Sequence, residues 1–458
     1  MRRALIAFPA VITLASVAVQ ACSKTDDQGK LEDAAPLCTV TCAYGPTGGG
    51  DTTTRPLNAS LRLPAVPLAS EPGSGTWTSW AVDRLPGTSR IPPPPPPSPP
   101  GDTSIAVRIS PDQVWNVGGP GPSDDEVYFA ATEARTAGRV GDFGDFLLSI
   151  QTARGTWAPW YTPNHVDAGT SYATHLMGGF QVVSLAVANG DLQICAVASD
   201  RSGGRTINPL WQVSREKSEG LGPHGTYRRW LRLKMVPGHG EGFQDVSCAG
   251  VRNPQTGVDD LHVVAMTKDG QLWHTIARGP LPTSRTGSPA TWTEWDNLGA
   301  RLGIASRIET ESWAYDIAAS PTPGVLNLVA VGSTGGGPPR LLHFVRFASG
   351  NWSPGTDLFA GAPTKVATPP RLTGTLVRVS IAACQHGVSA GRQHLAIALL
   401  SSPGIYFTIA STSREDWDGS ELTGATYIRP WEDLAALSGF RSKPSPIGIT
   451  ITERPFAP

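Results

Sequence analysis

The sequence predicts an all-β fold, a six-bladed β-propeller of four-stranded antiparallel blades, and three observations support this prediction. First, 51 glycines and 42 prolines among 458 residues favour many turns over long helices. Second, groups of four short, alternating apolar segments recur along the chain. Third, the two ends of the repeat region carry complementary fragments of one further repeat. A seven-bladed ring is the alternative if the loops contain another, weaker repeat.

The clearest repeat occupies residues 243–299. Its four strand-like segments are 243–250, 259–266, 271–278 and 291–299, and a glycine-containing turn at 267–270 separates the second from the third. Apolar residues roughly alternate along each segment, which is typical of strands in an antiparallel sheet. One repeat therefore predicts one blade.

Four other stretches of the chain repeat this order more loosely. They lie at residues 104–160, 180–230, 315–352 and 379–431, which makes five blades with the clearest one. Residues 76–82 resemble an isolated fourth strand, and residues 446–452 resemble an isolated first strand. Joined, they would form a sixth blade, so the ring is predicted to be closed by both chain ends, which removes free sheet edges.

The N-terminus has the features of an export signal. Arg2 and Arg3 precede an apolar stretch at 4–19, which predicts a signal peptide over residues 1–21. Cys22 follows Val19-Gln20-Ala21 in a pattern similar to a bacterial lipobox, in which this cysteine receives the lipid. Simple secretion without lipid is the alternative.

The remaining segments are assigned from composition. Residues 22–56 are polar and rich in glycine and threonine, which predicts a flexible, lipid-anchored tether, and residues 57–458 are assigned to the propeller. Within the tether, Cys38 and Cys42 are predicted to form a small local disulfide, because a zinc site would need two more ligands. Residues 92–100, nearly all proline, predict a stiff surface loop.

The net charge and the motifs limit the classes of partner that the chain is expected to bind. The net charge is −1 and no basic stripe is present, so nucleic acid is excluded as a partner. No metal-binding or cofactor-binding motif occurs, and neither a metal nor a cofactor is predicted. We expect a monomer in the cell envelope, held to the membrane through the lipid alone, with Ser23 after the lipid cysteine favouring the outer membrane; secretion is the alternative.

The segments Asp269-Gly-Gln-Leu-Trp-His274 and Trp292-Thr-Glu-Trp-Asp-Asn-Leu-Gly299 resemble the blades of the PLL-type and tectonin-like β-propeller lectins. This resemblance implies ligand sites between neighbouring blades, where sugars lie against aromatic side chains. The positions that match such sites are Trp273, His274, Trp292, Trp295, Trp211 and Trp230. For each tryptophan, packing of blade against blade is the alternative role.

Strand alternation separates two of these residues. Trp273 and His274 are adjacent in one strand, so their side chains are predicted to point to opposite faces of the sheet. We therefore expect Trp292 or Trp295 to supply the ring on which a sugar stacks, and Trp273 to be mainly structural.

The function is predicted from these aromatic residues and from the catalytic motifs that the sequence lacks. The chain has no sialidase-type Asp box, no HExxH, no G-x-S-x-G and no phosphate-binding loop, which predicts that it is not an enzyme. The predicted function is an envelope-attached, lectin-like binding protein whose partner is a glycan. The alternative is a protein-interaction or scaffold propeller that binds an envelope protein and no sugar.

Overall fold

The fold is known from a computed structural model. The described residues are 38–44, 57–63, 79–84, 105–111, 127–133, 146–151, 180–189, 191–202, 205–215, 230–279, 291–304, 314–320, 322–332, 340–359, 376–386, 392–401, 404–413, 427–428 and 431–433. The predicted signal peptide, Cys22, the proline-rich loop and residues 446–452 lie outside them.

Two three-stranded antiparallel sheets come first in the chain. One contains β1 (Cys38–Tyr44), β2 (Leu57–Leu63) and β3 (Ser79–Arg84). The other contains β4 (Ile105–Pro111), β5 (Val127–Glu133) and β6 (Phe146–Gln151).

Four larger antiparallel sheets follow, here called blades A to D. Blade A contains β7 (Phe180–Ala188), β8 (Asp191–Ala198), β11 (Leu210–Arg215) and β12 (Leu231–Arg232), with a ribbon of β9 (Asp200–Ser202) and β10 (Arg205–Ile207) between β8 and β11. Blade B contains β13 (Phe243–Arg252), β14 (Asp259–Thr267), β15 (Leu272–Arg278), β16 (Thr291–Trp292) and β17 (Asp296–Asn297), followed by the short helix α2 (Leu298–Arg301).

Blades C and D repeat this plan. Blade C contains β18 (Ala314–Ala319), β19 (Leu326–Gly332), β20 (Arg340–Arg346) and β21 (Thr356–Asp357). Blade D contains β22 (Leu376–His386), β23 (Arg392–Ser401), β24 (Gly404–Ser413), β25 (Tyr427–Ile428) and β26 (Glu432–Asp433).

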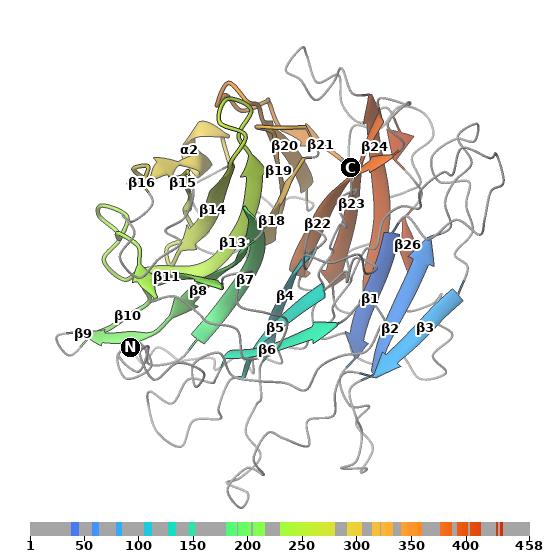
Figure 1. The fold of residues 1–458 in the computed structure, drawn as a ribbon, viewed down its shortest axis with the longest axis horizontal. Helices are drawn as coiled ribbons and strands as arrows, with labels where there is room; N and C mark the ends of the chain where they lie inside the picture. The colour runs from blue at the N-terminus through green and yellow to red at the C-terminus, as the bar shows by residue number, and fades with distance from the viewer. Residues whose placement is uncertain are drawn as a thin grey trace, which may run out of the picture.

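The blades follow one another around a ring. The first strand of each blade contacts the first strand of the next, from β7 through β13 and β18 to β22, and β4 contacts β7 in the same way. Figure 1 shows these sheets radiating from a common centre with their first strands innermost. The predicted all-β, propeller-like arrangement of antiparallel sheets is confirmed, whereas the number of six blades and the closure by both chain ends stay predictions.

The innermost strands lie very close together and are joined by a repeated hydrogen bond. A Cβ at Gly250 in β13 would collide with the backbone of Val187 in β7, so only glycine fits there. At one equivalent position in each of blades A, B and C, a polar side chain accepts an N–H from the next blade. The three bonds are Ser184 Oγ from Cys248 N at 3.0 Å, Ser247 Oγ from Ile317 N at 3.3 Å and Asp316 Oδ2 from Ile381 N at 3.0 Å.

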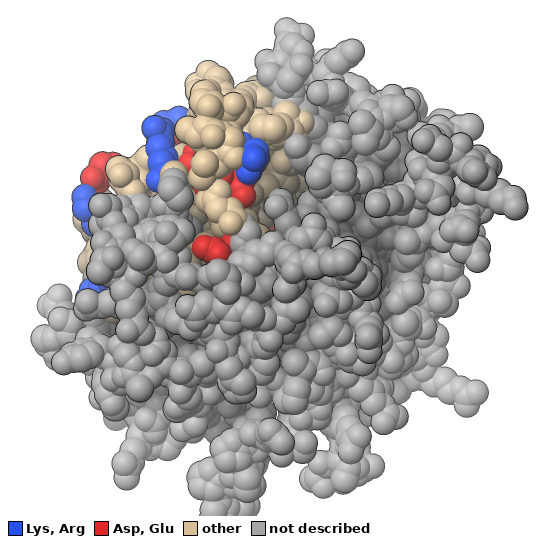
Figure 2. All heavy atoms as spheres, in the orientation of Figure 1, with Lys and Arg blue, Asp and Glu red and all other residues tan. Residues whose placement is uncertain are grey.

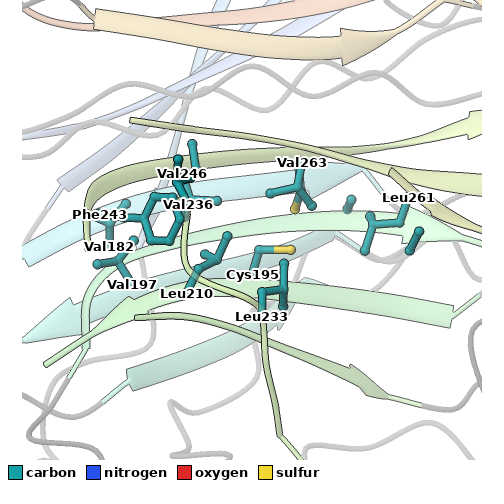
Figure 3. Packing of buried hydrophobic residues seen from close by; sticks show 14 residues of the cluster. Val182, Cys195, Val197, Leu210, Leu233, Val236, Phe243, Val246, Leu261 and Val263 are labelled. Atoms are coloured by element: carbon teal, nitrogen blue, oxygen red, sulfur yellow. The ribbon is translucent and has the colours of Figure 1, made fainter. Parts of the chain in front are cut away.

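The hydrophobic core lies between the blades. Each of the boundaries A–B, B–C and C–D holds one cluster of buried apolar side chains from the two facing sheets. Figure 3 shows the A–B cluster, where Leu210 and Val197 of blade A meet Phe243 and Val263 of blade B. Because a blade packs on both faces, all nine residues of β14 are buried, unlike a strand with one face in water.

The described β-structure begins within the segment that is predicted to be a tether. Strand β1 lies within residues 22–56, assigned above to a flexible tether, and pairs with β2 along its whole length. The alternation of Cys-Thr-Val-Thr-Cys explains this strand. The side chains of Cys38 and Cys42 lie outside the part of the structure that is described, so their disulfide stays a prediction.

Within the described part of the chain, no helix is long and apolar enough to span a membrane. The one helix described there, α2, has four residues.

Candidate functional site

The two neighbours Trp273 and His274 point to opposite faces of blade B, as the alternation along β15 predicts. Trp273 packs against the A–B cluster. His274 is 4% exposed, and its ring centre lies 5.8 Å from that of Trp352 in blade C, edge to face. The candidate ligand residues are therefore divided between two boundaries.

The last strand of blade B is interrupted at Thr293–Trp295, and this places Trp292 and Trp295. The segments on either side of the interruption, β16 and β17, both pair with β15. Two hydrogen bonds of Thr293 stabilise this interruption. Its hydroxyl accepts the N–H of Ile276 at 3.0 Å, and its carbonyl accepts the hydroxyl of Thr275 at 2.8 Å. Trp292 and Trp295 are both half-buried and pack on the A–B cluster beside Trp273.

Trp295 is held by its indole N–H. Nε1 donates to the carbonyl of Lys234, just after β12 of blade A, at 2.8 Å. Its ring centre lies 5.3 Å from that of Phe243, with the planes tilted by 39°. Beside it, the exposed Lys234 ammonium pairs with the Glu294 carboxylate at 2.9 Å. Since its N–H is already bonded, Trp295 can meet a ligand only through the face or edge of its ring.

Polar side chains also flank Trp273. The ring of His239 lies 5.4 Å from Trp273, edge to face, and its Nδ1 is 3.1 Å from the Asp269 carboxylate. Burial by itself would raise the pKa of Asp269, but the hydrogen bond from Thr267 and the nearby His239 outweigh it, and the pKa lies below its ordinary value. Asp269 is therefore a carboxylate at neutral pH and serves as an acceptor at this boundary.

Trp211, Trp230 and His274 do not present a surface to a ligand. Trp211 and Trp230 are each 8% exposed, and His274 lies at the B–C boundary. Among the described residues, the indole N–H groups of Trp211, Trp273, Trp292 and Trp431 are buried and have no hydrogen-bond partner. The resemblance implied that Trp211, Trp230 and His274 contact the ligand; their burial shows that in this structure they pack.

A buried polar pair was not foreseen from the sequence. Nδ1 of His262 in β14 lies 3.1 Å from Nε2 of His274 in β15. Burial, and after it the charges of Arg346 and Arg301, lower the pKa of His274 to about 3. Burial, followed by His274, Arg346 and Arg278, holds the pKa of His262 well below its ordinary value. Both imidazoles are therefore neutral at neutral pH.

The same two positions carry polar pairs in the neighbouring blades. In blade A, Gln212 donates to Gln193 at 2.9 Å. In blade C, His343 Nε2 lies 3.1 Å from the side-chain oxygen of Asn327. A polar residue at the same place in the second strands of blades A, B and C was the signal that could have revealed these pairs.

The described residues contain no group of three or more His, Cys, Asp or Glu side chains that could hold a metal ion. Cys195 and Cys248 are buried free thiols of the A–B cluster. A hydrogen bond with Cys248, together with burial, raises the pKa of Cys195 well above its ordinary value, so its thiol is protonated and unreactive. Figure 2 shows acidic and basic side chains interspersed over the described part of one face, without a large patch of one sign.

Comparisons with known proteins leave the family open. No protein-family model and no curated protein matches the chain. Among solved structures, the α-L-arabinanase of Cellvibrio cellulosa matches with 12% identity over 63% of this chain and 90% of that chain, with a TM-score of 0.34. A mutant of Synechocystis ACO matches with 10% identity over 82% of this chain and 72% of that chain, with a TM-score of 0.37. Likeness at this level assigns no activity.

These matches require one correction. The missing motifs led to the prediction that the chain is not an enzyme, yet one of the matched structures is that of an enzyme, the arabinanase. Motifs in one sequence do not exclude catalysis, because catalytic carboxylates can come from different strands of a fold. The prediction is therefore withdrawn.

Proposed function

We propose that this protein is an envelope-attached β-propeller that binds carbohydrate at the boundary between blades A and B. The observation that carries the proposal is the group of three half-buried tryptophans, Trp273, Trp292 and Trp295, gathered at one boundary. Sugars present C–H faces and hydroxyl edges, so a sugar site combines an aromatic surface with nearby polar groups.

The polar groups at this boundary suit hydroxyl recognition. The Asp269 carboxylate and His239 lie beside Trp273, and the Lys234–Glu294 pair lies beside Trp295. A carboxylate accepts hydrogen bonds from sugar hydroxyls, and an ammonium donates to them. Trp295 would contribute its ring, and Trp273 would mainly support the boundary.

A glycan array probed with a soluble form lacking residues 1–22 tests this function. Trp295→Ala should weaken binding of the glycan with the highest affinity by about 1–2 kcal/mol through loss of ring contact, and should lower the melting temperature less than Trp273→Ala. Trp273→Ala should mainly lower the melting temperature. A wild-type protein that binds no glycan, with both variants only destabilised, would replace this proposal by the protein-interaction propeller.

We also propose that the ring has six blades and that both chain ends close it. The sheets β1–β3 and β4–β6 would be the blades that precede blade A, since β4 contacts β7 as β7 contacts β13. Residues 446–452 would add the innermost strand to β1–β3, with β3 outermost. Deleting residues 444–458 should then lower the melting temperature well beyond the effect of losing a frayed end. An unchanged melting curve would contradict closure.

Attachment to the envelope is proposed to occur through lipid on Cys22. The supporting observation is the position of Cys22 directly after the signal-like residues 1–21. Cys22→Ser should move the protein from the membrane fraction to the soluble exported fraction. Persistent flotation of this variant with membranes, in the absence of detergent, would contradict the lipid anchor.

A further inference from the structure

Three arginines lie at the boundary between blades B and C, at the ends of their elements. They are Arg278, Arg301 and Arg346, the last residues of β15, α2 and β20. Leu342 and Phe344 of β20 belong to the B–C cluster, so alternation places Arg346 on the same face, toward blade B. His274 faces blade C, and alternation along β15 places Arg278 on that face too.

Arg346 and Trp352 are neighbours at this boundary. Their backbones form an isolated β-bridge, and the Trp352 ring reaches across to His274 of blade B. The Arg346 guanidinium lies against the turn at residue 350, because a Cβ placed on Gly350 would be 3.3 Å from its Nη2. Trp352 is half-buried and packs on the B–C cluster. An aromatic ring and a guanidinium thus lie side by side.

The guanidinium of Arg346 has no hydrogen bond or ion pair within the described part of the chain, although Arg346 is half-buried. Burial, and then the positive charge of Arg278, lower its pKa. The equivalent residue of blade B is Ala277, which packs in the A–B cluster. Blade C therefore has a charged residue at a position where blade B has a small apolar residue.

The nearby carboxylates are already engaged. Asp260 accepts the N–H of Gly279 at 3.1 Å and the side-chain amide of Asn253 at 2.9 Å. Asp296 pairs with Arg301 at 3.0 Å. The neighbouring imidazoles of His262 and His274 are neutral. Among the described residues, three guanidinium groups thus face two carboxylates, which leaves an excess of positive charge in partly buried surroundings.

We propose that Arg278, Arg301 and Arg346, together with Trp352, bind the carboxylate or sulfate group of an acidic saccharide. The planar guanidinium matches the paired oxygens of a carboxylate or sulfate and binds them through two parallel hydrogen bonds. The ring of Trp352 provides an apolar surface for the sugar that carries the anion. This inference rests on the proposed carbohydrate-binding function and names the class of sugar, at a second boundary.

Calorimetric titration of the full chain in detergent tests the site, with glucuronate, glucose and inorganic sulfate as probes. Glucuronate should bind more tightly than glucose, and its affinity should fall as salt concentration rises. Arg346→Ala should weaken the binding of glucuronate at least tenfold. The melting temperature should not fall, because the change removes repulsion between like charges and introduces the alanine that blade B has at the equivalent position. Arg346→Lys should recover only part of the loss. Arg340 lies at the other end of β20 and pairs with Asp357, so Arg340→Gln is the matched control and should leave the affinity for glucuronate unchanged.

The other outcomes separate this site from the A–B boundary. Glucuronate binding that survives Arg346→Ala but is lost in Trp295→Ala would overturn the arginine site and leave the proposed function standing. Binding of sulfate alone, lost in Arg346→Ala, with no affinity for either sugar, would overturn the saccharide as ligand of this site, whereas the proposed function at the A–B boundary would still be decided by the glycan array. Absence of binding by all three probes would overturn the site.

Discussion

The A–B and B–C boundaries share one backbone plan but differ in their side chains. At the A–B boundary blade B presents Trp273 and Trp295, and the buried polar pair is Gln193–Gln212. At the B–C boundary the equivalents of the two tryptophans are Leu342 and Gly355. The repeat therefore fixes where the strands lie, while substitutions at equivalent positions give each boundary its own chemistry.

One exchange shows how packing is preserved despite this divergence. Gly355 stands where blade B has Trp295, and a Cβ on Gly355 would lie 2.5 Å from the ring of Phe344. Phe344 in turn stands where blade B has Thr275. The aromatic volume has thus moved from the last strand to the third strand, and the boundary remains filled.

The largest expected difference between the boundaries is in packing. Trp273→Ala should lower the free energy of unfolding by about 3–5 kcal/mol, because it removes a large ring from the A–B cluster. Leu342→Ala, its counterpart in blade C, should cost about 2–4 kcal/mol. Denaturant unfolding of both variants measures the two values. A smaller loss for Trp273→Ala than for Leu342→Ala would reverse this ranking.

The next largest difference in stability is expected from the hydrogen bonds that join the innermost strands of neighbouring blades. Asp316 accepts hydrogen bonds from Ser247 Oγ at 2.6 Å, Ser380 Oγ at 3.1 Å and Ile381 N at 3.0 Å. Asp316→Ala leaves these donors unpaired and should cost about 2–4 kcal/mol of unfolding free energy. Ser184→Ala, which removes the acceptor of the Cys248 N–H at the A–B boundary, should cost about 1 kcal/mol. Asp316→Ser, the residue of the other blades, should restore part of the loss; equal losses for Asp316→Ser and Asp316→Ala would contradict the role of the bond.

Acid should destabilise the B–C boundary more than the A–B boundary. The unfolded chain protonates His262 and His274 near pH 6.5, whereas the folded pKa of His274 is about 3. Stability is therefore complete above pH 6.5 and is lost as the pH falls from 6.5 toward 3, by at most about 1.4 kcal/mol per pH unit for each histidine.

Thermal melting between pH 7.5 and 4.5 measures this loss. The double variant His262→Gln and His274→Gln copies the pair of blade A and should melt with less dependence on pH. His239→Gln, which alters the histidine paired with Asp269, is the control and should keep the wild-type pH dependence. A double variant as acid-sensitive as the wild type would contradict this assignment.

The smallest effect concerns the aromatic exchange in blade C. Gly355→Ala should cost about 1 kcal/mol, because the Phe344 ring must shift to accommodate the added methyl group. In the background of Phe344→Leu the same change should cost less, since the branched side chain leaves room. A double-mutant cycle of unfolding free energies gives the coupling, and strictly additive losses would show that the two positions do not compete for space.

The sequence by itself determined the elements of this protein. The alternation of apolar residues at 243–250, 259–266 and 271–278 predicted β13, β14 and β15, and the same alternation separated Trp273 from His274, because strand periodicity is local. Strand β1 was not predicted, because it lies in a polar, glycine-rich segment without a repeat signal.

Only the tertiary structure decided what lies between the blades. The bond from Ser247 to Asp316 joins residues 69 apart, and the effect of the Arg278 charge on Arg346 depends on how two whole sheets pack. Burial of Trp211 and Trp230, and exposure of part of Trp295, are likewise decided by the neighbouring sheet. The physical reason is that strand pairing follows a local period of two residues, whereas the fit of one blade on the next depends on side chains from both.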